Sequence, residues 1–412
     1  MKFDGIVVGG GAAGMLAAVF AARKGCRVLL LERNDRLGKK LLITGKGRCN
    51  VTNHCSWQEI LQNTPRNGRF LYSAMENFPP EEAERFFEEA GCRLKVERGN
   101  RVFPVSDRSQ SVLDALKNEL RKAQVSVKTA RVTSLLTEDG AVIGVETDSE
   151  SIYADWVILA TGGLSYPTTG STGDGYRMVR ALGHTVTALE GSLVPLCVEG
   201  SDCPDMQGLS LRNVAVRLLD SNGKVLYKDF GEILFTHFGL SGPMALSASA
   251  HLKGEGCKMV IDLKPALDEG KLGERILRDL QMYQNRTMEN ALTDLLPRSM
   301  IPVMLRRTGI DRNMQANSLK KEQRRALVTL LKNFDLTISG KRPVEEAIIT
   351  SGGIKVSEVN PKTMESKLVS NLYFAGEILD CDAYTGGFNL QIAWATAYAA
   401  AMGTTADCTS GA

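Results

Sequence analysis

Residues 3–32 read FDGIVVGGGAAGMLAAVFAARKGCRVLLLE, and this stretch decides the fold. An apolar run at 3–8 predicts a buried parallel strand, an alanine-rich run at 11–24 predicts a helix, and a second apolar run at 27–32 predicts another strand. Strand, helix and strand in this order are typical of a βαβ unit. The stretch therefore predicts an α/β protein with a parallel sheet.

The turn between the first strand and the helix contains Gly9-x-Gly11-x-x-Gly14. Gly9 permits a tight turn, Gly11 lets backbone amides approach a pyrophosphate, and Gly14 allows close packing of helix and strand. The helix N-terminus adds partial positive charge. Glu32, at the end of the second strand, is placed to accept hydrogen bonds from a ribose diol. Together these residues predict a dinucleotide site.

The composition is that of a globular protein. The chain has 412 residues, 43% hydrophobic and 24% charged, with a net charge of +3, so we expect two or three domains. Residues 5–22 carry no charge, but five glycines interrupt them and Asp4 precedes them where a signal peptide would be basic. We expect neither a signal peptide nor a membrane span.

Cysteine usage points to a reducing compartment. The nine cysteines are widely spaced, their number is odd, and none form a CxxC pair. We therefore expect no metal site, no disulfide framework and a cytoplasmic location. The sequence does not specify the oligomeric state.

Further along, helices are expected at 81–90 and 109–123, and a final strand and helix at 371–375 and 387–402. Between them, runs at 131–136, 142–147 and 151–153 predict a β-meander, followed by a separate buried strand at 156–160. The pattern of predicted elements changes after residue 191. Short β runs are expected at 214–219, 225–228 and 259–263, and a helical stretch at 272–333. We expect a first domain at 1–191 and 348–412, an inserted β-rich domain at 192–267 and 334–347, and a helical subdomain at 268–333.

A second group of glycines follows the expected strands far along the chain. Ala160-Thr161-Gly162-Gly163, Ala375-Gly376-Glu377 with Asp380 beyond, and Gly386-Gly387-Phe388-Asn389 resemble the corresponding segments of two-dinucleotide-fold flavoproteins. The resemblance implies FAD as the cofactor. It also implies that a carboxylate near 377–380 meets the ribityl or pyrophosphate part, and that the last helix points its N-terminus at the flavin pyrimidine ring.

A narrower resemblance lies at residues 44–53, TGKGRCNVTN, which is similar to the TGxGRCNxTN signature of the YhiN-like and BaiN-like bacterial FAD-dependent oxidoreductases. Blocks at 103–106, 172–176, 234–243 and 350–353 agree in order. The family usually has glycine where this chain has Lys46. The resemblance implies an α/β fold with a two-dinucleotide-binding-type FAD Rossmann domain, a parallel sheet plus a β-meander, an inserted β-rich domain and a helical subdomain.

These motifs and the resemblance give one set of candidate cofactor residues. They are Gly9, Gly11, Ala12, Ala13, Gly14, Glu32, Arg33, Lys40, Thr44, Gly45, Gly47, Arg48, Cys49, Asn50, Val132, Ala160, Thr161, Gly162, Gly163, Gly376, Glu377, Asp380, Gly386, Gly387, Phe388, Asn389 and Leu390. Because only one GxGxxG is present, the NAD(P)H implied by the resemblance is expected to dock transiently.

His237 and Cys49 are the candidate catalytic residues. An imidazole over the flavin could donate the proton that accompanies hydride addition, although a structural histidine is the alternative. Cys49 lies where related disulfide reductases place a redox pair, but Cys55 is at the wrong spacing, so a packing role is the alternative. Arg48 is a candidate clamp for pyrophosphate or for an anionic substrate.

Residues 298–332 hold nine basic side chains and only two acidic ones. Such segregation suits a phosphate backbone, although a solvated helix is the alternative. Family relatives imply reduction of a conjugated C=C bond, and the basic stretch favours a uridine of 23S ribosomal RNA, giving dihydrouridine. The alternatives are a small-molecule enone, such as an unsaturated bile acid or steroid intermediate, and a non-catalytic FAD- and RNA-binding assembly factor.

Overall fold

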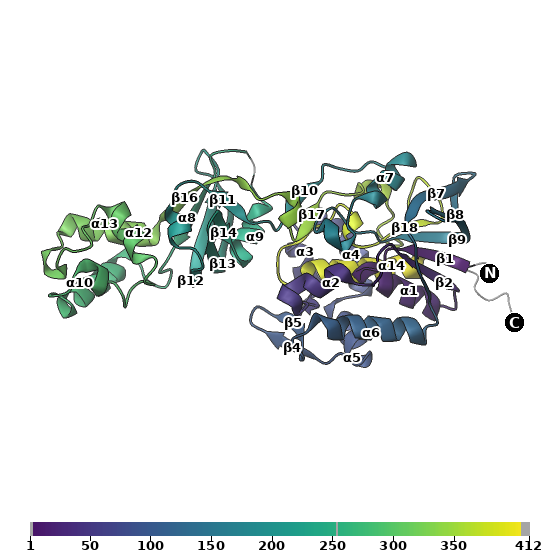
Figure 1. The fold of residues 1–412 in the computed structure, drawn as a ribbon, viewed down its shortest axis with the longest axis horizontal. Helices are drawn as coiled ribbons and strands as arrows, with labels where there is room; N and C mark the ends of the chain where they lie inside the picture. The colour runs from purple at the N-terminus through teal and green to yellow at the C-terminus, as the bar shows by residue number, and fades with distance from the viewer. Residues whose placement is uncertain (1–2, 253, 405–412) are drawn as a thin grey trace. The chain divides into compact units, whose positions relative to one another are not determined.

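The computed structural model describes residues 3–252 and 254–404; Cys408 and the outer ends of the expected first domain lie outside them. The chain forms two compact units, Met1–Ser192 with Val344–Ala412, and Leu193–Pro343 (Figure 1). Among the described residues, no helix is long and apolar enough to cross a membrane.

A seven-stranded sheet forms the centre of the first unit. Its strands, in spatial order, are β6 (Ser126–Thr129), β2 (Val28–Glu32), β1 (Phe3–Val8), β9 (Ser151–Leu159), β8 (Ala141–Thr147) and β7 (Val132–Glu138), with β18 (Leu372–Phe374) also paired to β9. Strands β6, β2, β1, β9 and β18 are parallel, whereas β7, β8 and β9 form an antiparallel meander. The predicted Rossmann sheet with a meander is confirmed.

Strand β9 differs from the expectation of two separate runs at 151–153 and 156–160. It is one continuous strand, because its two halves have different partners on one side. Tyr153 pairs with Gly144 of the antiparallel meander, and Val157 pairs with Leu372 of the parallel strand β18. The meander thus continues directly into the parallel sheet, with no turn between them.

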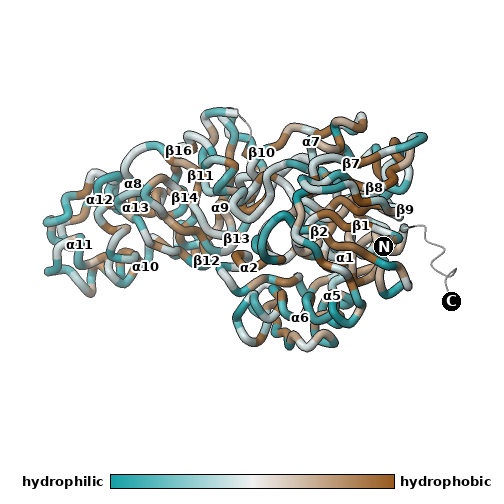
Figure 2. The backbone as a smooth tube through the Cα atoms, turned by 45° about the vertical axis from the view of Figure 1, so that its right-hand side comes forward, coloured by the Kyte–Doolittle hydropathy of each residue, from teal (hydrophilic) through white to brown (hydrophobic). Residues whose placement is uncertain are grey.

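Two helices rich in alanine cover the sheet: α1 (Ala12–Arg23) and α14 (Phe388–Gly403). They pack against each other, and the small side chains allow close approach (Figure 1). Both are apolar on most faces, as the mainly brown α1 in Figure 2 shows, because protein surrounds them. The two ends of the chain therefore build one core.

The other helices and strands of this unit lie outside the seven-stranded sheet. They are α2 (Lys39–Ile43), α3 (Trp57–Gln62), α4 (Tyr72–Asn77), α5 (Pro80–Glu89), α6 (Ser109–Lys122), α7 (Asp174–Ala181), the sheet of β3 (Thr52–Asn53), β5 (Arg101–Pro104) and β4 (Leu94–Glu97), and the pair β10 (Glu190–Ser192) and β17 (Ile349–Ser351).

The second unit contains a closed antiparallel barrel. Its strands, in order around the barrel, are β11 (Leu196–Val198), β14 (Gly239–Ser241), β13 (Val225–Thr236), β12 (Ser210–Leu219), β15 (Lys258–Asp262) and β16 (Phe334–Lys341). The expected β run at 225–228 covers only the start of the strand that the structure forms, β13. Strand β13 continues through charged residues to Thr236, because it pairs with β12 as far as Leu234 opposite Ser210. The predicted β-rich insertion is confirmed as a fold feature.

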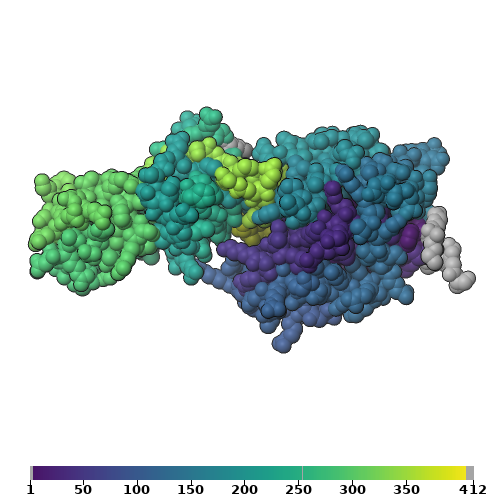
Figure 3. All heavy atoms as spheres, in the orientation of Figure 1, coloured from purple at the N-terminus to yellow at the C-terminus, as the bar shows by residue number. Residues whose placement is uncertain are grey.

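Four helices of this unit follow β15 in the sequence and precede β16, although these two strands pair directly in the barrel. They are α10 (Glu269–Met282), α11 (Met288–Ala291), α12 (Ile301–Thr308) and α13 (Lys321–Lys332), while α8 (Asp202–Asp205) and α9 (Pro243–Ser249) belong to the barrel part. The expected helical stretch is thus divided into separate helices. One apolar core includes residues from both parts, and their atoms adjoin in Figure 3. Treating 268–333 as a separate subdomain stays a proposal.

Candidate cofactor site

The first glycine turn is tightly packed at two positions and open at the third. A Cβ atom at Gly9 would lie 2.5 Å from the Ala160 carbonyl oxygen, and one at Gly14 would lie 1.8 Å from the Gly9 carbonyl oxygen. At Gly11 a Cβ atom would meet nothing within 4 Å. Gly11 is the N-cap of α1 and no side chain caps this helix, so its first amides have no side-chain acceptor.

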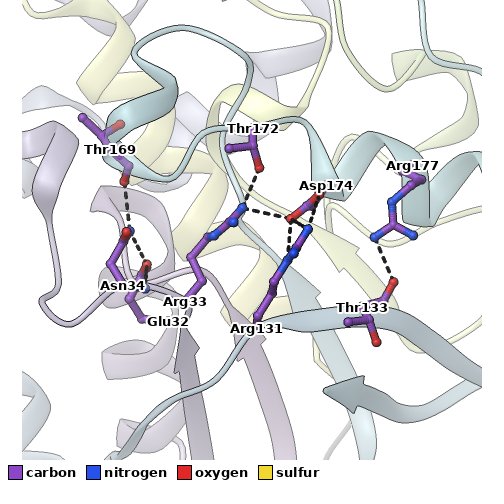
Figure 4. A network of polar contacts seen from close by, with 9 residues as sticks. All are labelled: Glu32, Arg33, Asn34, Arg131, Thr133, Thr169, Thr172, Asp174 and Arg177. Carbon is purple, nitrogen blue, oxygen red and sulfur yellow. Dashed lines mark hydrogen bonds and ion pairs between the residues drawn. The ribbon is translucent and has the colours of Figure 1, made fainter. Parts of the chain in front are cut away.

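Glu32 holds this turn against the end of β2. Its Oε2 accepts a hydrogen bond from the Gly10 amide at 2.7 Å, and its Oε1 accepts from the Asn34 amide at 2.9 Å. Oε1 also accepts from Asn34 Nδ2 at 2.6 Å (Figure 4). A carboxylate has about four acceptor positions, so one remains for a ribose hydroxyl. The Ala130 amide donates to the Glu32 carbonyl at 2.9 Å, which brings the segment before the buried Val132 to the same edge.

Arg33 is already engaged by side chains of the first unit. Its Nη1 donates to Thr172 Oγ1 at 2.6 Å and to Asp174 Oδ2 at 2.9 Å, and Arg131 pairs with the same carboxylate at 3.2 Å (Figure 4). Asp174 therefore fixes the orientation of both guanidinium groups. Arg33 directly follows Glu32, the residue predicted to bind the ribose.

The signature loop at 44–50 turns through left-handed backbone. The φ angles are 56° at Gly45, 59° at Lys46, 82° at Gly47 and 61° at Cys49. Only glycine adopts these angles without a steric cost. This explains in physical terms why the family signature favours glycine at the position of Lys46.

Cys49 is fully buried, and burial raises the pKa of its thiol to about 12. Burial also raises the pKa of the Cys55 thiol to about 12. Both groups are therefore neutral thiols at neutral pH and poor nucleophiles. The structure favours the packing role of Cys49 over the catalytic one.

Arg48 does not extend freely toward a ligand. Its Nε donates to Asp107 Oδ1 at 2.8 Å, it pairs with Glu97, and its guanidinium lies 4.1 Å from the centroid of the Phe103 ring. Two carboxylates therefore already neutralise this cation. The expected clamp on pyrophosphate or on an anionic substrate would require Arg48 to leave both partners.

The segments after β9 and β18 meet through a network of polar side chains. Lys40 Nζ lies 2.6 Å from both Glu377 Oε2 and Ser165 Oγ, and Ser165 Oγ donates to Glu377 Oε1 at 3.0 Å. A Cβ atom at Gly163 would lie 2.3 Å from Thr350 Oγ1. Further along, the buried Asp380 forms an ion pair with Arg66.

The last helix begins with Gly387, whose φ is 100° and at which a Cβ atom would lie 2.3 Å from the Thr52 carbonyl oxygen. No side chain caps α14. The Asn389 side chain is occupied, because its Nδ2 donates to the Ala383 carbonyl at 2.8 Å and its Oδ1 accepts from the Ala383 amide at 2.9 Å. The first-turn amides, with Phe388 and Leu390, are what this helix offers to a ligand.

The structure thus brings together predicted segments that are far apart in sequence. β1, β2, β9 and β18 are parallel, so the glycine turn, Glu32, 161–163 and 376–380 all follow the carboxyl ends of strands in one sheet. A Cβ atom at Gly376 would lie 2.8 Å from Ala13 Cβ. His237 belongs to the second unit, where it lies exposed between β13 and β14 with its ring 5.0 Å from that of Phe238.

These residues fit FAD. Asn50 Oδ1 and Thr161 Oγ1 are buried without a hydrogen-bond partner, and both belong to predicted cofactor segments. The uncapped start of α1 suits a pyrophosphate, Glu32 suits a ribose, and the uncapped start of α14 suits the electron-rich side of a flavin. Bound FAD supplies hydride transfer, and the chain's own groups position it. Within the described residues, no group of three or more metal-ligating side chains gathers.

Comparison with known proteins gives the family. The family described as HI0933-like protein Rossmann domain matches residues 3–403. This chain belongs to that family. It is an FAD-dependent oxidoreductase, so both the family predicted from 44–53 and the enzyme class are confirmed.

Two curated relatives match nearly the whole chain. The 3-dehydro-bile acid delta(4,6)-reductase of Clostridium scindens is 34% identical over 403 residues, covering 96% of this chain and 97% of the relative. The ribosomal RNA dihydrouridine synthase of Escherichia coli is 29% identical, covering 97% and 98%. Among solved structures, the 3-ketosteroid delta1-dehydrogenase of Sterolibacterium denitrificans has a TM-score of 0.52 at 14% identity, covering 97% of this chain and 99% of that chain, which shows a shared fold.

Sequence reasoning missed several polar residues beside the site. Arg66, Ser165 and Asp382 lie in no motif that marks a ligand, and Thr350 is not singled out as a candidate. Thr350 could have been found, because it belongs to the 350–353 block that resembles the family.

Proposed function

We propose that this FAD-dependent oxidoreductase uses NAD(P)H to reduce a C=C bond conjugated to a carbonyl, and that its substrate is a uridine of 23S ribosomal RNA. A hydride adds to one carbon of the C5=C6 bond and a proton to the other, giving dihydrouridine, while NAD(P)H becomes NAD(P)⁺. The name of the Escherichia coli relative supports the reaction. Membership of a family of oxidoreductases favours turnover over the role of a non-catalytic assembly factor.

The basic stretch at 298–332 is partly neutralised in the structure. Four of its cations pair with carboxylates of the same unit: Arg306 with Asp202 and Asp205, Arg307 with Asp335, Arg312 with Glu289 and Lys332 with Asp262. We therefore narrow the proposed RNA contact to the cations of this stretch that pair with no carboxylate among the described residues.

The observation that carries the RNA proposal is the group of cations at the start of α13. Within the part of the chain that the structure describes, Lys320, Lys321, Arg324 and Arg325 form no ion pair with a carboxylate, and all are at least partly exposed. Two like-charge pairs four residues apart and cations at a helix N-terminus both destabilise a helix. A phosphate backbone would offset that cost. We call these four residues the α13 cations.

Replacing the α13 cations with glutamine tests this surface. We expect weaker binding to a 23S ribosomal RNA fragment, and a slope of log affinity against log salt that is smaller by about 3, because roughly four phosphate contacts are lost. A control with Arg69, Arg93, Lys117 and Lys362 changed to glutamine removes equal charge from the first unit and should leave the slope unchanged. Equal slopes for both variants would contradict the proposal.

Deleting the gene in its host tests the substrate itself. We expect dihydrouridine to disappear from 23S ribosomal RNA, as measured by mass spectrometry of its nucleosides, and to return with the wild-type gene. Unchanged dihydrouridine would overturn the RNA proposal.

A small-molecule enone is the second candidate, favoured by the name of the Clostridium scindens relative and by the neutralised cations. An unsaturated 3-oxo bile acid would then stimulate NAD(P)H oxidation, and the α13 cations would not matter. For either substrate we propose His237 as the proton donor. The histidine proposal predicts that His237→Asn lowers turnover while leaving reduction of the flavin by NAD(P)H unchanged.

A further inference from the structure

The chain leaves the first unit after Ser192 and returns at Val344. Strands β10 and β17 flank these two crossings and pair antiparallel, with Ser192 opposite Ile349 and Glu190 opposite Ser351. We call this pair the neck. Two strands of three residues are too short to be stable alone, so other groups of the first unit must hold them.

One buried carboxylate holds both strands of the neck. Asp382 is 3% exposed; its Oδ2 accepts a hydrogen bond from Ser192 Oγ at 3.0 Å and its Oδ1 accepts one from Ser351 Oγ at 2.9 Å. Each oxygen therefore binds the last residue of one strand. Hydrogen bonds to a charged acceptor are stronger than those between neutral groups.

The segment that carries Asp382 also carries predicted cofactor residues. Glu377 accepts a hydrogen bond from the Thr350 amide of β17 at 2.8 Å, and Thr350 Oγ1 accepts from the Leu164 amide at 2.7 Å. Leu164 directly follows the glycines of the 161–163 turn. Asp380 pairs with Arg66, whose Nη1 reaches Ser351 Oγ at 3.4 Å.

We propose that residues 376–382 couple FAD binding to the order of the neck, with Asp382 as the positioning residue that transmits the coupling. When FAD orders Glu377 and Asp380, the same short segment presents Asp382 to both strands. Without FAD the segment is less restrained, and the hydroxyl contacts of Ser192 and Ser351 weaken. Cofactor loading thereby restricts the connection to the second unit. The proposal rests on FAD binding and not on the substrate.

Hydrogen exchange of the full-length protein, with FAD and after its removal, tests this coupling. In the wild type we expect FAD to slow exchange of the amides at 188–192 and 349–353 by about tenfold. In Ser192→Ala/Ser351→Ala this slowing should fall below about threefold, while the response at 9–16 stays as in the wild type. Ser192→Thr/Ser351→Thr retains both hydroxyls and should restore the slowing at the neck.

Two results would overturn the proposal. One is wild-type neck exchange that is the same with and without FAD while 9–16 responds. The other is an alanine variant whose neck is protected by FAD as strongly as the wild type. If the double variant does not fold, Ser351→Ala alone removes one of the two bonds and should give an intermediate slowing. Loss of substrate turnover does not enter these readouts, so failure of the proposed reaction remains a separate result.

Discussion

Lys46 is an exposed side chain on backbone that only glycine adopts without cost. Its φ and ψ angles are 59° and 41°, and both neighbouring residues are glycines with positive φ. The position has no visible compensation in packing, because the side chain faces solvent. The signature loop thus contains local strain that the family's usual glycine would not have.

We expect Lys46→Gly to raise the free energy of unfolding by about 1 kcal/mol, because it removes the left-handed penalty of a residue with a Cβ atom. Urea unfolding of the FAD-free protein measures this. Lys117→Gly, inside helix α6, is the matched control and should lower the same free energy by about 1 kcal/mol. A loss of stability in both variants would contradict the account of the loop.

At the scale of elements, the sequence predicts what local patterns determine. The predicted bounds of the βαβ unit, of helix α6 and of the final helix agree with those in the structure to within a residue or two. Apolar periodicity and glycine positions specify these elements locally. The continuity of β9 depends on β18, far away in sequence, and the length of β13 depends on its pairing with the whole of β12, so the short apolar runs do not reveal either. The same holds for the site: its glycines are predictable, whereas the ion pairs of Arg33 and Arg48 are not.

His184 joins three elements of the first unit and gives a pH prediction. Its Nδ1 lies 3.2 Å from Glu358 Oε2, its Nε2 lies 2.9 Å from Ser366 Oγ, and its ring packs edge-on against Phe374 of β18. Ser366 Oγ already accepts bonds from the Leu368 and Val369 amides, so it donates to His184. Burial lowers the pKa of His184, and the neutral ring is the form that fits.

Because the folded state holds His184 with a lowered pKa, the unfolded state binds more protons below about pH 6.5. We therefore expect stability to fall between pH 7.5 and 5.5. Glu358 also has a lowered pKa, but its contribution is lost only at more acidic pH. In urea unfolding, His184→Gln should show a smaller fall of stability than the wild type. Identical pH dependence in the two proteins would refute this assignment.

At the scale of the whole molecule, both ends of the chain supply candidate cofactor residues to the first unit, and the second unit contains the barrel, His237 and the α13 cations. We expect FAD to lie in the open space beside Gly11, at the start of α1. Gly9 and Gly14 cannot test it, because an added Cβ atom would clash with backbone at either position. A substitution at Gly11 can test it, since a methyl group there meets no protein atom within 4 Å.

Isothermal titration of FAD into the FAD-free Gly11→Ala protein is the most direct measurement. We predict that the variant folds with wild-type stability in urea but binds FAD at least about tenfold more weakly, because the methyl group occupies the approach of the pyrophosphate. Gly273→Ala, in helix α10 of the other unit, should bind FAD as the wild type does. Wild-type affinity in Gly11→Ala would contradict the account.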